Sequence, residues 1–148
     1  TNYCQAGGNF FVSGAYVASD LWDNRLVKAN EEDKKFAMEV LKYKWRVGQA
    51  ARNGKVKSVA SPFPEITGSY TYYQDLNPES YVVESPDALE PAAQGAFTIL
   101  RYSENNLSAG IAYKGNYKTC VLGFPFEAIR TVTERELLMK AILTFFEH

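Results

Sequence analysis

Histidine is almost absent from this sequence: the only one among 148 residues is the last, His148. We therefore expect no histidine general base, which removes Ser-His, Cys-His and histidine–metal schemes together. Cysteine is equally scarce, and Cys4 and Cys120 are too few for a disulfide framework or a metal cluster. Cys120 lies inside the apolar run 119–123 and is predicted to be a buried, inert thiol, whereas Cys4 could be free or paired.

An excess of charge of one sign is also lacking, since sixteen Lys and Arg residues balance seventeen Asp and Glu residues. Without a basic face, nucleic acid is not an expected partner. The short basic cluster at 42–46 is explained by a helix C-terminus, which favours cations. No apolar run approaches the roughly 20 residues of a membrane-spanning helix, so membrane insertion is not expected either.

Sequence motifs for cofactors and metals are missing as well. No P-loop, GxGxxG, CxxC, HExxH or EF-hand spacing occurs. A dinucleotide site would need the glycine pattern between a strand and a helix, and Gly7-Gly8 with Gly14 does not provide it. We therefore predict no cofactor and no metal site.

What the sequence does contain is a series of strand and helix signals. We expect residues 1–148 to form one α/β domain that belongs to a larger multidomain protein. The apolar run 10–13 has no polar alternation, which is typical of a parallel strand covered on both faces. A helix is predicted from the cap Asn30 through an apolar stripe that ends at Trp45.

The second half is predicted to begin with a long irregular excursion, because five of the six prolines fall between Ser61 and Pro91. A capping box of Thr133 and Glu136 predicts the start of the last helix. A mixed sheet with helices packed on it fits the order of these elements. The remaining predicted elements are strands at 55–60, 81–84, 96–102, 109–113 and 118–124, a tight turn at 114–117, and a helical apolar stripe at 137–146.

Acid–base chemistry without histidine would need carboxylates or tyrosines. Paired carboxylates can hydrolyse glycosides, but solvated charges and helix caps explain isolated ones as well. The candidates lie at strand ends or in loops, where open α/β sheets place their ligands: Asp20, Asp23, Glu84, Asp87 and Glu127.

A run of tyrosines within the irregular stretch is the candidate for ligand binding. Rings at a wet surface can stack on sugars, which makes Tyr70, Tyr72 and Tyr73 candidate binding residues. Alternating tyrosines are equally typical of an edge strand. The sequence leaves both interpretations open.

Two segments carry a resemblance to a known family: Gly7 to Trp22, with Ser13-Gly14-Ala15-Tyr16 at its centre, and Leu122 to Phe146. They resemble the central strand and turn, and the last strand and helix, of class I glutamine-amidotransferase-like domains. More specifically, they resemble the divergent form in large secreted bacterial proteins labelled xanthan lyases. The resemblance implies a flavodoxin-like three-layer sandwich: a mixed, mostly parallel sheet, flanking helices, and a C-terminal β-hairpin plus helix. It also implies a secreted, cell-surface or periplasmic location.

The resemblance does not extend to amidotransferase chemistry. Active members have a cysteine at the sharp turn, where this chain has Ala15, and Ser13 is the only nucleophile nearby. They also have His-Pro-Glu after a late strand, and here Phe124 stands in place of the histidine. The resemblance implies that the chain covers only the later part of the fold, with the rest of its parent chain as the expected partner.

Two functions follow from this reading. The first is a non-catalytic accessory domain, structural or ligand-binding, of a secreted protein associated with polysaccharide or the cell wall. The alternative is a polysaccharide lyase or hydrolase with four candidate catalytic residues: Ser13, Tyr16, Asp20 and Glu127. Tyr16 is the suspected base.

The structure can separate these functions. An enzyme predicts a concave site near residues 13–20 and 124–127 that contains a carboxylate or tyrosine of shifted pKa. A support domain predicts the same strand ends packed under loops, with Asp20 bonded to backbone amides. A sugar-binding module predicts an exposed row of tyrosines at 70–73.

Overall fold

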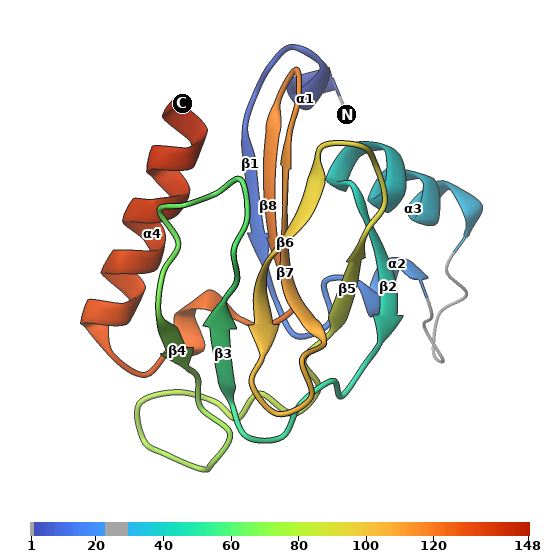
Figure 1. Cartoon of the computed structure of the whole chain (residues 1–148). Helices are drawn as coiled ribbons and strands as arrows, with labels where there is room; N and C mark the ends of the chain where they lie inside the picture. Colours follow the sequence, from blue (N-terminus) through green and yellow to red (C-terminus); the bar gives the residue numbers. More distant parts are fainter. Residues whose placement is uncertain (1, 23–29) are drawn as a thin grey trace.

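The computed structural model describes residues 2–22 and 30–148 of the chain, and Figure 1 shows their arrangement. The described strands are β1 (Phe10–Ser13), β2 (Tyr43–Val47), β3 (Lys55–Ser58), β4 (Ser69–Thr71), β5 (Ala88–Pro91), β6 (Ala96–Tyr102), β7 (Ser108–Lys114) and β8 (Lys118–Leu122). The described helical segments are α1 (Asn2–Gln5), α2 (Ser19–Trp22), α3 (Glu31–Phe36), the π-helical η1 (Ala37–Leu41), the 3₁₀ turn η2 (Phe126–Ala128) and α4 (Val132–Glu147).

The main sheet has six strands in the order β1-β8-β7-β6-β3-β4, and it curls across the centre of the molecule (Figure 1). Only β1 and β8 run parallel among these described strands, and every other neighbouring pair is antiparallel. The short loops between β6, β7 and β8 allow only antiparallel pairing, because a parallel pair needs a long crossover. The expectation of a flavodoxin-like, mostly parallel three-layer sandwich is therefore wrong.

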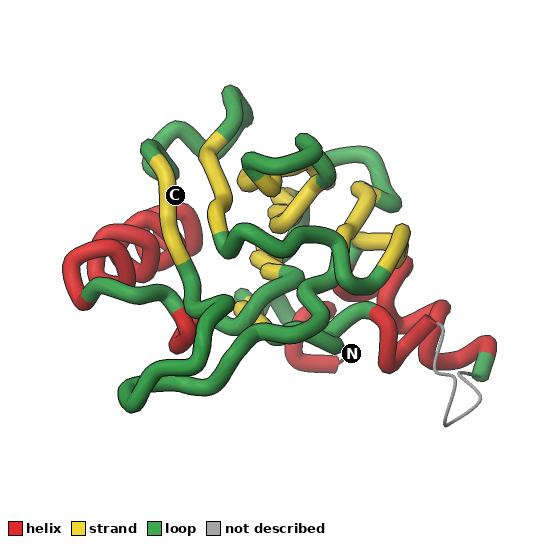
Figure 2. Tube along the Cα trace, turned by 90° about the horizontal axis from the view of Figure 1, so that it is seen from below, coloured by secondary structure: helices red, strands yellow, loops and turns green. Residues whose placement is uncertain are grey.

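Both faces of this sheet are nonetheless covered. On β8, Cys120 and Leu122 belong to one hydrophobic cluster, whereas Val121 between them belongs to another. The first cluster is closed by α4, and the second by α2, α3 and a two-stranded ribbon of β2 and β5. Figure 2 shows from below that helices lie on either side of the strands. Double coverage explains why the interior strand β8 has four consecutive buried residues although most of the sheet is antiparallel. The expectation that β1 is covered on both faces is not met, because β1 is an edge strand without a buried residue.

The helix predicted from Asn30 to Trp45 ends earlier than expected. Asn30 and Asp33 form a capping box at the start of α3, as the acidic first turn favoured. After η1 the chain turns at Lys42, whose φ of 67° lies in the left-handed region, and residues 43–47 continue as β2. The basic cluster at 42–46 therefore lies in the turn and in β2, and not at a helix C-terminus. Residues 43–47 form a strand because they pair with β5, which is more than forty residues away along the chain.

The last helix and the hairpin before it are present. The turn after Lys114 joins β7 to β8, as predicted. The cap of α4 is Thr131 with Glu134, two residues earlier than the predicted box. Its buried face lies against the sheet, and Phe145 stacks on Phe63 at a ring-centroid distance of 4.5 Å.

The proline-rich excursion is irregular over most of its length and includes β4 and β5. The strand predicted at 81–84 does not form. Instead, Val83 is buried, and its N–H donates to the carbonyl of Tyr73 at 3.0 Å. The irregular segment from residue 74 onward is the yellow-green loop in Figure 1.

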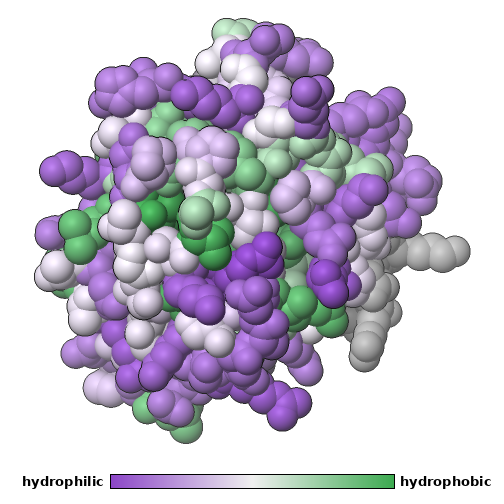
Figure 3. All heavy atoms as spheres, viewed as in Figure 1, coloured by the Kyte–Doolittle hydropathy of each residue, from purple (hydrophilic) through white to green (hydrophobic). Residues whose placement is uncertain are grey.

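The surface in the view of Figure 3 is largely hydrophilic, with hydrophobic residues in small patches separated by polar ones. Among the described residues, no helix combines the length and apolar character that a membrane span would need.

Candidate functional site

The carboxyl ends of β1 and β8 lie side by side because the two strands are parallel, with Ser13 opposite Leu122. The hydroxyl of Ser13 accepts a hydrogen bond from the N–H of Phe126 at 3.2 Å. Gly14 donates its N–H to the carbonyl of Leu122 at 3.3 Å. The candidate nucleophile Ser13 is therefore half-buried and joins the two candidate segments as a structural contact.

The central polar residue at these strand ends is Asp87, which is fully buried just before β5. One carboxylate oxygen accepts hydrogen bonds from the N–H of Ala18 at 3.0 Å, the N–H of Ser19 at 2.9 Å and the hydroxyl of Ser19 at 3.2 Å. The other oxygen accepts from the indole N–H of Trp45 at 3.1 Å. The side chain of Asp87 thus ties α2 to the β2–β5 ribbon.

The main chain of Asp87 connects the same residue to the main sheet. Its N–H donates to the carbonyl of Gly123 at 2.6 Å, and its carbonyl accepts from the hydroxyl of Tyr102 at 2.7 Å. Burial raises the pKa of the Asp87 carboxyl to about 6, although the four hydrogen bonds that the carboxylate accepts act to lower it. At these strand ends Asp87 is a carboxylate that accepts from backbone amides, and Asp20 lies on α2 as an exposed residue.

The position where the resemblance would place a histidine is filled by a packed ring. Phe124 is fully buried and stacks on Tyr72, with ring centroids 5.0 Å apart and planes inclined by 13°. Phe124 itself has no group that could transfer a proton. The thiol of Cys120 is buried with a raised pKa, as its apolar surroundings predicted.

The other candidates gather around two neighbouring hollows at this end of the sheet. A small hollow of about 240 Å³ is lined by Gly14, Ala15, Tyr16, the segment 81–84 and Pro125. Tyr16 and Tyr81 are both about half exposed. Glu84, one of the carboxylate candidates, lies in its wall. A concave site therefore exists where the enzymatic alternative required one.

The second hollow, of about 420 Å³, contains Glu127 and Tyr73 together with two arginines, Arg130 and Arg135. Glu127 accepts a hydrogen bond from the Tyr81 hydroxyl at 2.6 Å. Burial, followed by this hydrogen bond, raises the pKa of Tyr81. Tyr73 donates to Glu79 at 2.7 Å, which raises its pKa, and Arg130 lies over its ring at 5.2 Å.

The tyrosine run does not form an exposed row. Tyr70 and Tyr72 are buried in the core beneath α4 and β8, and only Tyr73 is partly exposed. Tyr70 lies on β4, which is an edge strand of the main sheet, so the alternation follows the edge-strand pattern. Asp23, the remaining carboxylate candidate, lies outside the described residues.

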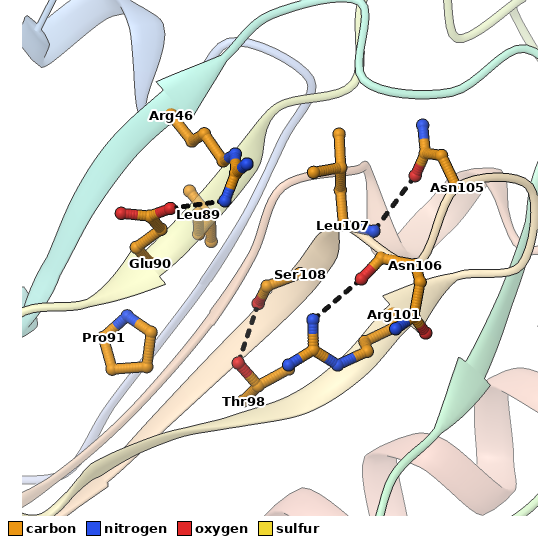
Figure 4. A pocket seen from close by; sticks show the side chains of 10 residues that line it. All are labelled: Arg46, Leu89, Glu90, Pro91, Thr98, Arg101, Asn105, Asn106, Leu107 and Ser108. Atoms are coloured by element: carbon orange, nitrogen blue, oxygen red, sulfur yellow. Dashed lines mark hydrogen bonds and ion pairs between the residues drawn. The ribbon is translucent and has the colours of Figure 1, made fainter.

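A third hollow, of about 520 Å³, lies elsewhere and contains none of these candidates. It is lined by residues of the β2–β5 ribbon and of the β6–β7 hairpin, and Figure 4 shows their side chains. We call it the Arg101 hollow, and its lining is Arg46, Leu89, Glu90, Pro91, Thr98, Arg101, Asn105, Asn106, Leu107 and Ser108. Sequence reasoning missed it because its residues come from four strands and one loop, with no local motif.

The polar groups of the Arg101 hollow differ in how far they are already paired. Arg46 forms an ion pair with Glu90 at 2.7 Å across the β2–β5 ribbon. Arg101 donates to the carbonyl of Asn106 at 2.7 Å. In the described part of the chain, Arg101 has no carboxylate partner. The hollow therefore carries one guanidinium charge that no internal acid neutralises.

Metal binding finds no support in residues 2–22 and 30–148, where no group of three or more His, Cys, Asp or Glu side chains converges. No known protein-family model matches the sequence, and no curated protein matches it either.

Proposed function

We propose that this chain is a non-catalytic accessory domain, with a supporting or ligand-binding role, in a protein associated with polysaccharide or the bacterial cell wall. The observation that carries this proposal is that the polar and aromatic side chains at the carboxyl ends of β1 and β8 are engaged in internal contacts. Asp87, Ser13 and Phe124 fill the place where an α/β enzyme would present reacting groups, and their contacts are internal. The polysaccharide setting and the secreted or surface location rest on the resemblance of the two end segments.

The alternative, a polysaccharide lyase or hydrolase, is favoured by one observation. Tyr81, Glu127 and Arg130 lie around adjoining hollows beside Tyr16, and elimination needs a base together with a group that neutralises the substrate carboxylate. The raised pKa of Tyr81 argues against it as the base, because a tyrosine with a raised pKa stays protonated at neutral pH. Its hydroxyl instead donates to Glu127.

The test is a combined turnover and binding screen of the purified chain against anionic bacterial polysaccharides. Absorbance of unsaturated sugar ends reports elimination, a reducing-end assay reports hydrolysis, and thermal shift reports binding. We expect a thermal shift, or no response, without new sugar ends. Cleavage that is lost in Tyr16→Phe, Asp20→Asn or Glu127→Gln would overturn the proposal.

A further inference from the structure

The Arg101 hollow is built to hold its guanidinium in place. Asn106 has a φ of 64°, in the left-handed region that asparagine tolerates better than most residues. This turn directs its carbonyl to Arg101 at 2.7 Å. Asn105 secures the loop, since its amide donates to the carbonyl of Ala50 at 2.6 Å and its oxygen accepts from the N–H of Leu107 at 3.0 Å.

Around this cation the lining supplies the other groups that a hydroxylated ligand needs. Thr98 and Ser108 bond to each other through their hydroxyls at 3.2 Å at the floor of the hollow (Figure 4). The side-chain amide of Asn106 forms no hydrogen bond within residues 2–22 and 30–148. Glu90, half exposed on the opposite wall, is held by Arg46 and presents a carboxylate as an acceptor.

Apolar atoms complete the lining. Leu89 is fully buried beneath the hollow, while Pro91 and Leu107 stand at its sides (Figure 4). Sites for small molecules usually combine such apolar walls with a few convergent polar groups. The C–H face of a sugar ring would pack against Pro91 and Leu107 while its hydroxyls reach Asn106 and Glu90.

We propose that the Arg101 hollow binds a carboxylate-bearing sugar, with the sugar carboxylate on Arg101. A guanidinium binds a carboxylate through two parallel hydrogen bonds, and Arg101 has no acid of its own. Glu90 selects against a doubly charged phosphate, because its carboxylate repels a second anionic charge and instead accepts from ring hydroxyls. This inference rests on the proposed ligand-binding role and gives it a site and a ligand class.

The experiment is a titration of the ¹⁵N-labelled chain, followed by NMR, with methyl glucuronide, methyl glucoside and inorganic phosphate. The two glycosides differ only at C6, which is a carboxylate in the first and a hydroxymethyl group in the second. We expect glucuronide to shift the amides of residues 98–108, and glucoside to bind about tenfold or more weaker. Phosphate binding tighter than glucuronide, or glucuronide shifts confined to the hollow of Tyr73 and Glu127, would overturn the proposal.

Variants identify the residues responsible. Arg101→Gln should weaken glucuronide binding about 10- to 100-fold, the range for a lost charged hydrogen-bonding group. Asn106→Gly keeps the left-handed turn and its carbonyl, and should cost several-fold affinity through the lost amide. Lys140→Gln, an equal charge change on an exposed residue of α4, should bind as the wild type does. Wild-type affinity in Arg101→Gln would refute the assignment.

The outcome also separates this inference from the proposed function. Polysaccharide binding that persists in Arg101→Gln would overturn the inference and leave the accessory role standing. Glucuronide binding at the hollow by a chain that cleaves polysaccharide would support the inference and overturn the non-catalytic role.

Discussion

Replacing Asp87 with asparagine tests the account of the strand ends most directly. The carboxylate is fully buried and accepts hydrogen bonds from Ala18, Ser19 and Trp45. Burial nevertheless raises its pKa from 3.8 to about 6. Asparagine has nearly the same shape but does not titrate, so Asp87→Asn removes the pH dependence of this residue.

The sign and size of the effect follow from linkage. Since the folded-state pKa is the higher one, the stability that Asp87 contributes is fully present below pH 4. It is lost as the pH rises through 6. A pKa of about 6 against 3.8 corresponds to about 3 kcal/mol. We therefore expect the free energy of unfolding of the wild type, relative to Asp87→Asn, to fall by up to about 3 kcal/mol from pH 4 to pH 7.5.

The assay is urea unfolding at several pH values, monitored by tryptophan fluorescence, to which Trp45 beside Asp87 contributes. Other titrating groups are common to both proteins and cancel in the difference. Ser19→Ala provides a matched variant: it removes a hydroxyl donor that lowers the Asp87 pKa, so the loss of stability with pH should be larger and extend to higher pH. A wild type that instead gains stability over Asp87→Asn as the pH rises would show that the hydrogen bonds outweigh burial.

Two further predictions concern the core beneath α4. The hydroxyl of Tyr72 is buried without a hydrogen-bond partner among the described residues, so Tyr72→Phe should raise the free energy of unfolding by about 1 kcal/mol. A lower free energy of unfolding for Tyr72→Phe in urea would mean that the hydroxyl has a hydrogen-bond partner. Phe145→Ala should cost about 3–5 kcal/mol, because the ring is buried and stacks on Phe63. Leu137 lies on the same helix and is 59% exposed, so Leu137→Ala should change the free energy of unfolding by less than about 0.5 kcal/mol. Equal losses of stability in Phe145→Ala and Leu137→Ala would contradict the placement of α4.

Short-range signals predicted the elements whose conformation depends on nearby residues. The capping box of Asn30 begins α3, and the turn after Lys114 closes the β7–β8 hairpin. The apolar stripe of α4 was recognised although its cap is Thr131. Such features depend on backbone dihedral angles and side-chain periodicity within about one turn or one hairpin, which the sequence displays directly.

The helical stripe that included Trp45 shows where this reasoning failed. Residues 43–47 have apolar positions compatible with a helix, yet they form β2 because β5 offers backbone hydrogen bonds and Tyr43 fills a buried place in the second cluster. The same limit explains the fold-class error. An unbroken apolar run indicates that both faces of a strand are covered, but it does not indicate whether the neighbouring strand is parallel or antiparallel.

The sequence by itself determined that histidine is absent before residue 148, and where the last hairpin and helix lie. The tertiary structure alone decided which of many acids became the buried Asp87, and which arginine remained without an acidic partner in the Arg101 hollow. Whether a charged side chain is buried or paired depends on groups from distant parts of the chain, and a local sequence pattern does not predict those contacts.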